Sequence, residues 1–167
     1  EYQIIGGLVV MQLTNNHLSQ KDFKNHKNLL EYQQLDKKIN PVLLVTSILK
    51  GSKVAENEII SAPFILKEVN GEKVSTLPDL RRVLFLYFRK NGLKYFTFLT
   101  ENDKYFMLEY FETREQETFL SEKYKYEINE FTSKLLALGK YQGNDFIPVK
   151  ETVAPAPSLK VTQDNLK

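Results

Sequence analysis

The sequence contains no cysteine and only two histidines among its 167 residues. The absence of cysteine excludes disulfide bonds, thiolate catalysis and zinc sites built on cysteine ligands. The two histidines, His17 and His26, lack the i, i+4 spacing of a helical metal-binding pair. We therefore predict that the chain has no metal site and no cofactor.

Long apolar runs and a strong net charge are also missing. No stretch approaches the roughly 20 consecutive apolar residues that span a bilayer. With 23 basic and 21 acidic residues the net charge is +2, so no global field favours nucleic acid. The segment 18–39 is locally basic, but acidic residues interrupt the charge, and aromatic residues are not interleaved as in single-strand binders. We predict neither a membrane nor a nucleic-acid partner.

The sequence has no local signature of catalysis. It lacks the G-x-S-x-G, G-x-G-x-x-G and Gly-Lys-Ser/Thr motifs that mark serine nucleophiles and phosphate sites. Glu56 and Glu58 lie near a turn and could form an acid–base pair, but we favour the interpretation that both carboxylates are solvated. The chain itself is therefore predicted not to be an enzyme.

The most informative pattern present is the stretch Phe64–Leu84. It predicts a strand, a turn at Asn70-Gly71, a short second strand and the start of a helix, because Asn and Gly both tolerate positive φ. Ser75 or Thr76 can cap the helix, and Pro78 suits its first turn. We expect this helix to run from Pro78 to about residue 89.

Further strands are predicted on both sides of this stretch. The nearly continuous apolar run 42–49 is typical of a central strand, and the aromatic-rich segments 95–100 and 105–110 predict a second hairpin. Gly6-Gly7 precedes an apolar strand at 8–13. The two glycines indicate either a tight, closely approached turn or a flexible loop that enters an ordinary strand.

Two further helices and a tail complete the predicted organisation. A polar helix is expected over 18–39, because Asn40-Pro41 stops it. An apolar stripe at 4,4,3,4,3 spacing predicts one amphipathic helix within 113–139, whose apolar face is either core or an oligomer contact.

We expect one domain over 1–139 and an extended tail or linker over 140–167. The start at Glu1 without Met or a signal-peptide pattern indicates a fragment of a longer protein. The oligomer-contact candidates are Leu120, Tyr124, Ile128, Phe131 and Leu135.

The order of Gly6–Val10, Phe64–Gly71 and Leu77–Leu84 resembles a PDZ domain, most closely the second, C-terminal PDZ domain of Deg/HtrA-type serine proteases. The resemblance implies an α+β fold. It would be a partly open antiparallel β-barrel or sandwich with a groove helix, a helical insertion at about 18–40 and a trailing amphipathic helix at about 113–139. A C-terminal or extended peptide would add as a strand beside residue 8, with its carboxylate on the Gly-rich loop. The implied groove residues are Gly6, Gly7, Leu8, Val9, Val10, Leu77, Arg81 and Leu84.

Two departures from the family pattern concern this groove. Ala62-Pro63 replaces the usual Gly-Asp, and Arg81 is aimed at the groove. Two interpretations therefore stay open, one in which the groove is blocked and one in which it is open to a ligand. The strand edge would be blocked by the chain's own insertion or by a neighbouring subunit. Weak or no binding of free C-terminal peptides is the prediction.

The resemblance implies a non-catalytic regulatory or assembly domain of a Deg/HtrA-type serine protease in protein quality control. It would mediate oligomerisation or substrate engagement, with the protease domain of the same protein and other copies as partners. The family analogy places it in the periplasm or cell envelope. The alternative is a stand-alone peptide-binding adaptor that is not linked to proteolysis.

Overall fold

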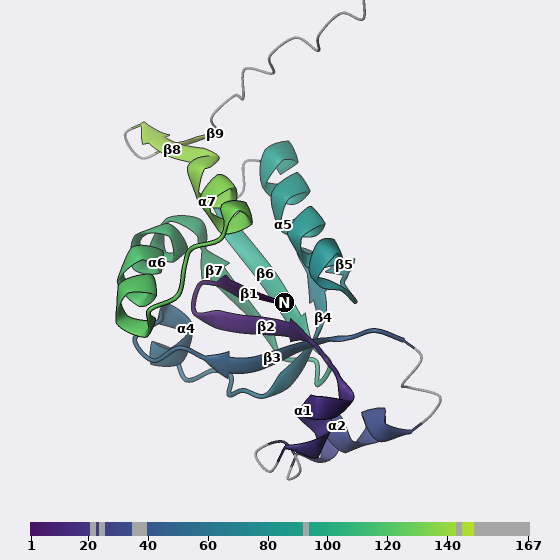
Figure 1. Ribbon diagram of the computed structural model, residues 1–167. Coiled ribbons are helices and arrows are strands. Elements are labelled where there is room, and N and C mark those ends of the chain that lie inside the picture. Colours follow the sequence, from purple (N-terminus) through teal and green to yellow (C-terminus); the bar gives the residue numbers. More distant parts are fainter. Residues whose placement is uncertain (21–22, 24–25, 35–39, 92–93, 143–144, 149–167) are drawn as a thin grey trace, which may run out of the picture.

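A computed structural model describes residues 1–20, 23, 26–34, 40–91, 94–142 and 145–148. Its centre is a seven-stranded antiparallel sheet in the order β1-β2-β3-β4-β6-β7, with β5 paired to β4 (Figure 1). Helices pack around this sheet, so the predicted α+β, PDZ-like architecture is confirmed. The strands are β1 Tyr2–Ile5, β2 Leu8–Gln12, β3 Leu43–Ile48, β4 Phe64–Val69, β5 Glu72–Lys73, β6 Tyr95–Thr100 and β7 Tyr105–Glu109.

The two predicted hairpins and the helix that follows the first are present. Asn70 and Gly71 adopt φ values of 51° and 77° between β4 and β5, as a tight hairpin turn requires. The helix α5 spans Leu77–Asn91. It begins with a reciprocal cap, because the Asp79 N–H donates to Thr76 Oγ1 while the Thr76 N–H donates to the Asp79 carboxylate.

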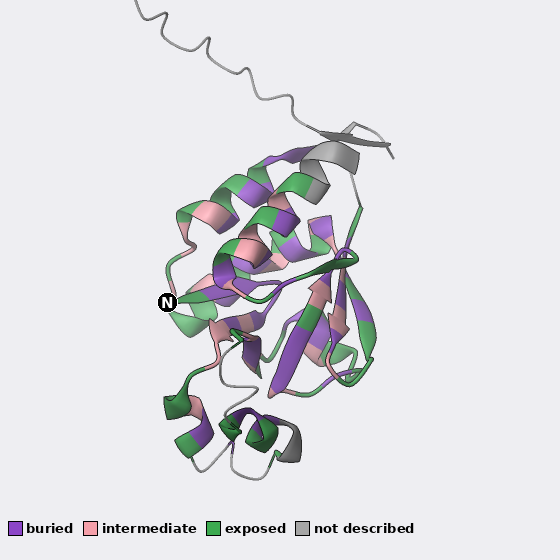
Figure 2. Ribbon diagram, turned by 90° about the vertical axis from the view of Figure 1, so that its right-hand side faces the viewer, coloured by how far each residue is buried: buried purple, intermediate pink, exposed green. Residues whose placement is uncertain are grey.

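The buried residues, coloured purple in Figure 2, include parts of both the strands and the helices, and they form two core clusters. Side chains alternate along β3, so Leu43 and Val45 join the main core with α5 while Leu44 faces the other side. On that other side Leu44 and Ile65 pack against the inserted segment. Both faces of the central strands are therefore buried, which accounts for the nearly continuous apolar run in β3.

The insertion packs against Leu44 and Ile65 of the sheet and is not one helix. It contains α1 (Asn15–Ser19), α2 (Lys27–Leu30) and the 3₁₀ turn η1 (Glu31–Gln33), while 35–39 lie outside the described residues. The prediction of a continuous polar helix over 18–39 is wrong in this respect. The insertion is anchored by the Tyr32 hydroxyl, which donates to Glu101 Oε1 at 2.6 Å.

The trailing segment is two helices rather than the single predicted one. α6 (Tyr110–Tyr124) ends where Lys125 adopts a left-handed φ of 56°, and α7 (Glu130–Ala137) begins at the cap residue Asn129. The apolar stripe is consequently divided between two helices. Leu120 and Leu135 are fully buried within the chain, which supports the core interpretation. An oligomer contact through Tyr124, Ile128 and Phe131 stays a prediction.

The remaining elements are short. The helix α4 (Lys53–Glu56) follows β3, and β8 (Gly139–Gln142) pairs with β9 (Asp145–Pro148) where an extended tail was expected. The rest of that predicted tail, 149–167, falls outside the described residues. Within the described part of the chain no helix is long and apolar enough to cross a bilayer.

Candidate functional site

The Gly6-Gly7 pair forms a two-residue turn that joins β1 directly to β2. Its φ values of 56° and 86° are both positive, as a type I′ hairpin turn requires. A Cβ atom on Gly6 would lie 2.6 Å from Leu108 Cδ1, and one on Gly7 would lie 2.5 Å from Ser52 Oγ. The turn is thus tight and closely packed, which is the first of the two interpretations of this pair.

The edge of β2 is occupied by the chain's own strand β1. The antiparallel register pairs Ile5 with Leu8 and Gln3 with Val10. Because a two-residue turn closes on a hydrogen-bonded pair, the N–H and C=O groups of Leu8 and Val10 point toward β1. A PDZ ligand would add to this edge as an antiparallel strand. β1 takes that place, so the groove is filled by residues 2–5 and not by the insertion or a neighbouring subunit.

Arg81 reaches across from α5 to hold β1. Its Nε donates to Gln3 Oε1 at 3.0 Å, and its Nη1 lies 2.6 Å from the Glu1 carboxylate. The guanidinium lowers the pKa of Glu1, first by hydrogen bonding and then by its charge. Arg81 therefore lies on the groove wall as predicted, but it binds the chain itself. The neighbouring wall residues Leu77 and Leu84 are buried in the core.

Gln3 is the polar centre of this arrangement. Its side chain is fully buried; Nε2 donates to Thr132 Oγ1 at 2.7 Å, and Oε1 also accepts from Asn129 Nδ2 at 3.2 Å. Both partners belong to α7 or its cap, so β1 is tied to β2, α5 and α7 together. Sequence reasoning missed Gln3. A signal was available in the segment Ile4–Val9, where β-prone residues flank Gly-Gly in the pattern of a two-residue hairpin. That pattern would have placed Gln3 on a strand paired with β2.

A buried carboxylate lies beside the Gly-Gly turn. Glu117 of α6 is 1% exposed, and its Oε1 accepts a hydrogen bond of 2.9 Å from the Tyr126 hydroxyl. Burial raises the pKa of Glu117 to about 7, although Tyr126 and the Gly6 backbone N–H both favour the charged form. Glu117 thus sits against the turn where the resemblance puts a ligand's terminal carboxylate.

A pocket is present near the end of β2 that is farthest from the Gly-Gly turn. It has a volume of about 550 Å³ and lies between the end of β2, the first turn of α5 and α1. Its wall includes His17, whose Nδ1 lies 3.1 Å from the Thr14 N–H, and partial burial lowers the pKa of this imidazole. No group of three or more potential metal-ligating side chains occurs among the described residues.

The structure brings the predicted groove residues together. Gly6 to Val10 form the turn and β2, α5 contacts β2, and Arg81 closes the space from the other side. What differs from the prediction is the occupant, which is β1. The peptide-binding roles of these residues stay predictions.

Comparison with known proteins identifies the family of the chain. The sequence model described as a PDZ domain matches residues 1–134, which is most of the chain and runs from β1 into α7. No curated protein matches the chain significantly. PDZ domains are protein-interaction modules and are generally not catalytic. The match and the fold together establish that this chain belongs to the PDZ domain family.

Proposed function

We propose that this PDZ domain regulates or assembles a Deg/HtrA-type serine protease and does not capture free C-terminal peptides in its groove. The similarity of Gly6–Val10, Phe64–Gly71 and Leu77–Leu84 to the second PDZ domain of those proteases supports the family context. The observation that carries the functional part is the pairing of β1 along the edge of β2.

Displacing β1 would be costly. Ile5 is fully buried and Ile4 nearly so, and exposing each would cost about 1.5–3 kcal/mol. The buried hydrogen bonds of Gln3 add about 1 kcal/mol each. A peptide that competes with β1 must offset more than about 5 kcal/mol, which would turn micromolar intrinsic affinity into binding weaker than millimolar.

Peptide titration tests the groove. A library of fluorescent peptides with free C-terminal carboxylates, titrated with the chain and followed by anisotropy, should give no saturable binding below about 1 mM. The same peptides with amidated C-termini provide the matched control, because they lack the carboxylate. Low-micromolar binding that depends on the free carboxylate would contradict a filled groove and would favour the peptide-binding adaptor.

The protease context is tested on the full-length protein. Deleting 1–134 should change the number of subunits per oligomer, obtained by dividing the mass from light scattering by the mass of the shortened subunit. The protease domain should retain hydrolysis of a short chromogenic peptide. A parent polypeptide without a serine protease domain would refute the Deg/HtrA assignment and leave the PDZ fold unaffected. An unchanged number of subunits per oligomer would refute the assembly role.

A further inference from the structure

The end of β3 has a strand edge that no strand in the described part of the chain covers. Pairing with β4 stops at Val45 opposite Phe64, whereas β3 continues to Ile48. The Leu49 N–H donates to the Gly7 carbonyl at 2.8 Å, so alternation along the antiparallel ladder turns the N–H and C=O of Ile48 away from β2. Among the described residues neither Ile48 group has a backbone partner.

A cleft of about 460 Å³ lies beside this edge, separate from the groove between β2 and α5. Its size is within the usual range of ligand sites, about 300–1,000 Å³. Its far wall is the segment 58–62, whose backbone groups make no backbone hydrogen bond within the described part of the chain. Its apolar lining comes from Ala55, Ile60 and Ala62. The end of β3 and the segment 58–62 therefore form two sides of one slot that is lined by both apolar and polar side chains.

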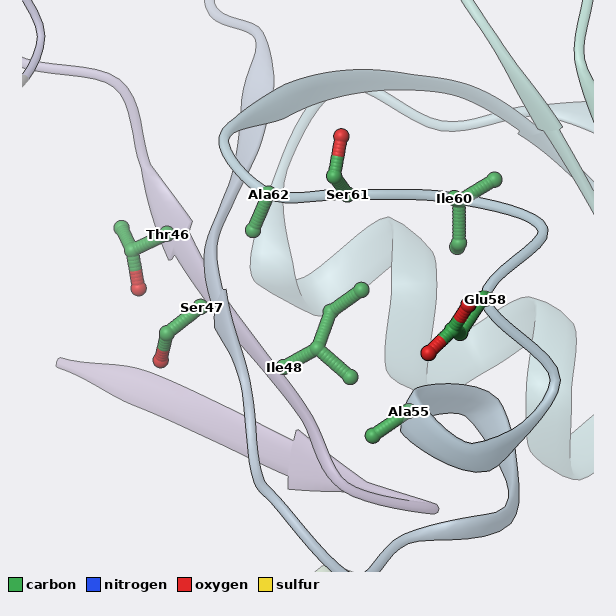
Figure 3. A pocket seen from close by; sticks show the side chains of 8 residues that line it. All are labelled: Thr46, Ser47, Ile48, Ala55, Glu58, Ile60, Ser61 and Ala62. Atoms are coloured by element: carbon green, nitrogen blue, oxygen red, sulfur yellow. The ribbon is translucent and has the colours of Figure 1, made fainter.

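One carboxylate points into this slot. Figure 3 shows the side chains of Ile48 and Glu58 directed toward each other from opposite walls. Glu58 is exposed and forms no ion pair with a described residue, whereas nearby Glu56 is paired with Lys53 at 3.0 Å. The slot therefore offers one negative charge beside a strand edge.

We propose that this cleft binds an extended segment of a partner protein that carries a lysine or arginine. The segment would hydrogen-bond to the Ile48 N–H and C=O, place a small apolar side chain against Ala55 and Ile60, and direct its cation to Glu58. A second copy of the chain fits less well, because its matching edge at Ile48 lies within its own cleft.

The test uses nuclear magnetic resonance of the ¹⁵N-labelled chain with the blocked peptide acetyl-Thr-Val-Lys-Val-Thr-amide. Saturable shifts are expected at the amides of Ile48, Ile60 and Ser61 at peptide concentrations up to about 5 mM. The matched peptide with glutamate in place of lysine should bind about fivefold more weakly. Glu58→Gln should remove that preference, while Glu56→Gln, outside the cleft lining, should keep it. Both positions are exposed, so the variants retain the fold.

Several results would overturn the proposal. Absence of shifts at Ile48, or equal affinity for the lysine and glutamate peptides, would exclude a basic extended ligand. Shifts confined to β2 and α5 would place binding in the other groove. Concentration-dependent shifts at Ile48 without peptide would identify a second copy as the occupant.

Discussion

Gly7→Ala tests the close packing of the turn that sets β1 beside β2. The new methyl group would overlap Ser52, whose position is fixed because its Oγ caps α4 by accepting from the Ala55 N–H at 3.2 Å. Ser52 is fully buried, so it has little room to move. The backbone φ of 86° adds strain for any residue with a Cβ.

Gly71→Ala is the matched control. Its φ of 77° carries the same kind of strain, but no atom lies within 4 Å of the added Cβ. We expect Gly71→Ala to lower the free energy of unfolding by about 1 kcal/mol. Gly7→Ala adds the overlap and should lower it by about 3–4 kcal/mol in total.

Urea unfolding followed by circular dichroism measures both changes. If each variant keeps the parent's slope of unfolding free energy against urea concentration, the shift of its urea midpoint reports a change in stability alone. Equal losses for Gly7→Ala and Gly71→Ala would refute the reasoning, because the overlap with Ser52 would then contribute nothing. A larger loss at Gly71 would refute it as well.

Three further predictions concern Glu117, Arg81 and Phe131. The pKa of Glu117 is about 7 in the folded chain against an ordinary 4.5, so its contribution to stability is complete below pH 4.5 and is lost as the pH rises through 7. Glu117→Gln removes this titration, so the free energy of unfolding of the variant minus that of the parent should rise by about 3 kcal/mol from acid to mildly alkaline pH. Urea unfolding at each pH measures this difference, and a difference that stays constant with pH would contradict the prediction. Arg81→Ala should cost about 1–2 kcal/mol by losing its hydrogen bond to Gln3, while Arg82→Ala, which removes an exposed ion pair with Glu72, should cost less than about 0.5 kcal/mol; equal costs would show that Arg81 does not hold β1. Phe131→Asp should unfold the chain at ambient temperature in circular dichroism, because Phe131 packs on the core, and a folded variant with a smaller oligomer mass would instead support the interface.

The parts of the fold predicted correctly depend on local chemistry. Asn70-Gly71 needs only its own positive φ values, and the start of α5 needs only the reciprocal cap between Thr76 and Asp79. Such signals operate over a few residues, so they survive whatever packs around them.

The trailing helix was predicted wrongly because spacing alone hid its break. Tyr124 and Ile128 keep a four-residue interval across the loop, and Lys125, which carries the left-handed turn, is neither Gly nor Asn. The short elements of the insertion were missed for a similar reason, since tertiary packing on Leu44 and Ile65 overrides the helical pattern.

The filled groove could be predicted only in part. Gly6-Gly7 between β-prone residues was a hairpin signal, and Arg81 was expected at the groove. The occupant depends on contacts that join Gln3 to Asn129 and Thr132, more than a hundred positions away in the sequence. A resemblance to peptide-binding relatives likewise describes the groove without describing what fills it.

Native-state hydrogen exchange at Leu8 and Val10 tests the central claim most directly. Both amides point toward β1 and should exchange as slowly as the Leu44 amide, which lies between β2 and β3. The exposed Gly71 amide provides the fast reference. Slow exchange at Leu8 and Val10 is the result that a groove filled by β1 predicts. Exchange at the rate of Gly71 would show that this edge is open to solvent and would contradict the account.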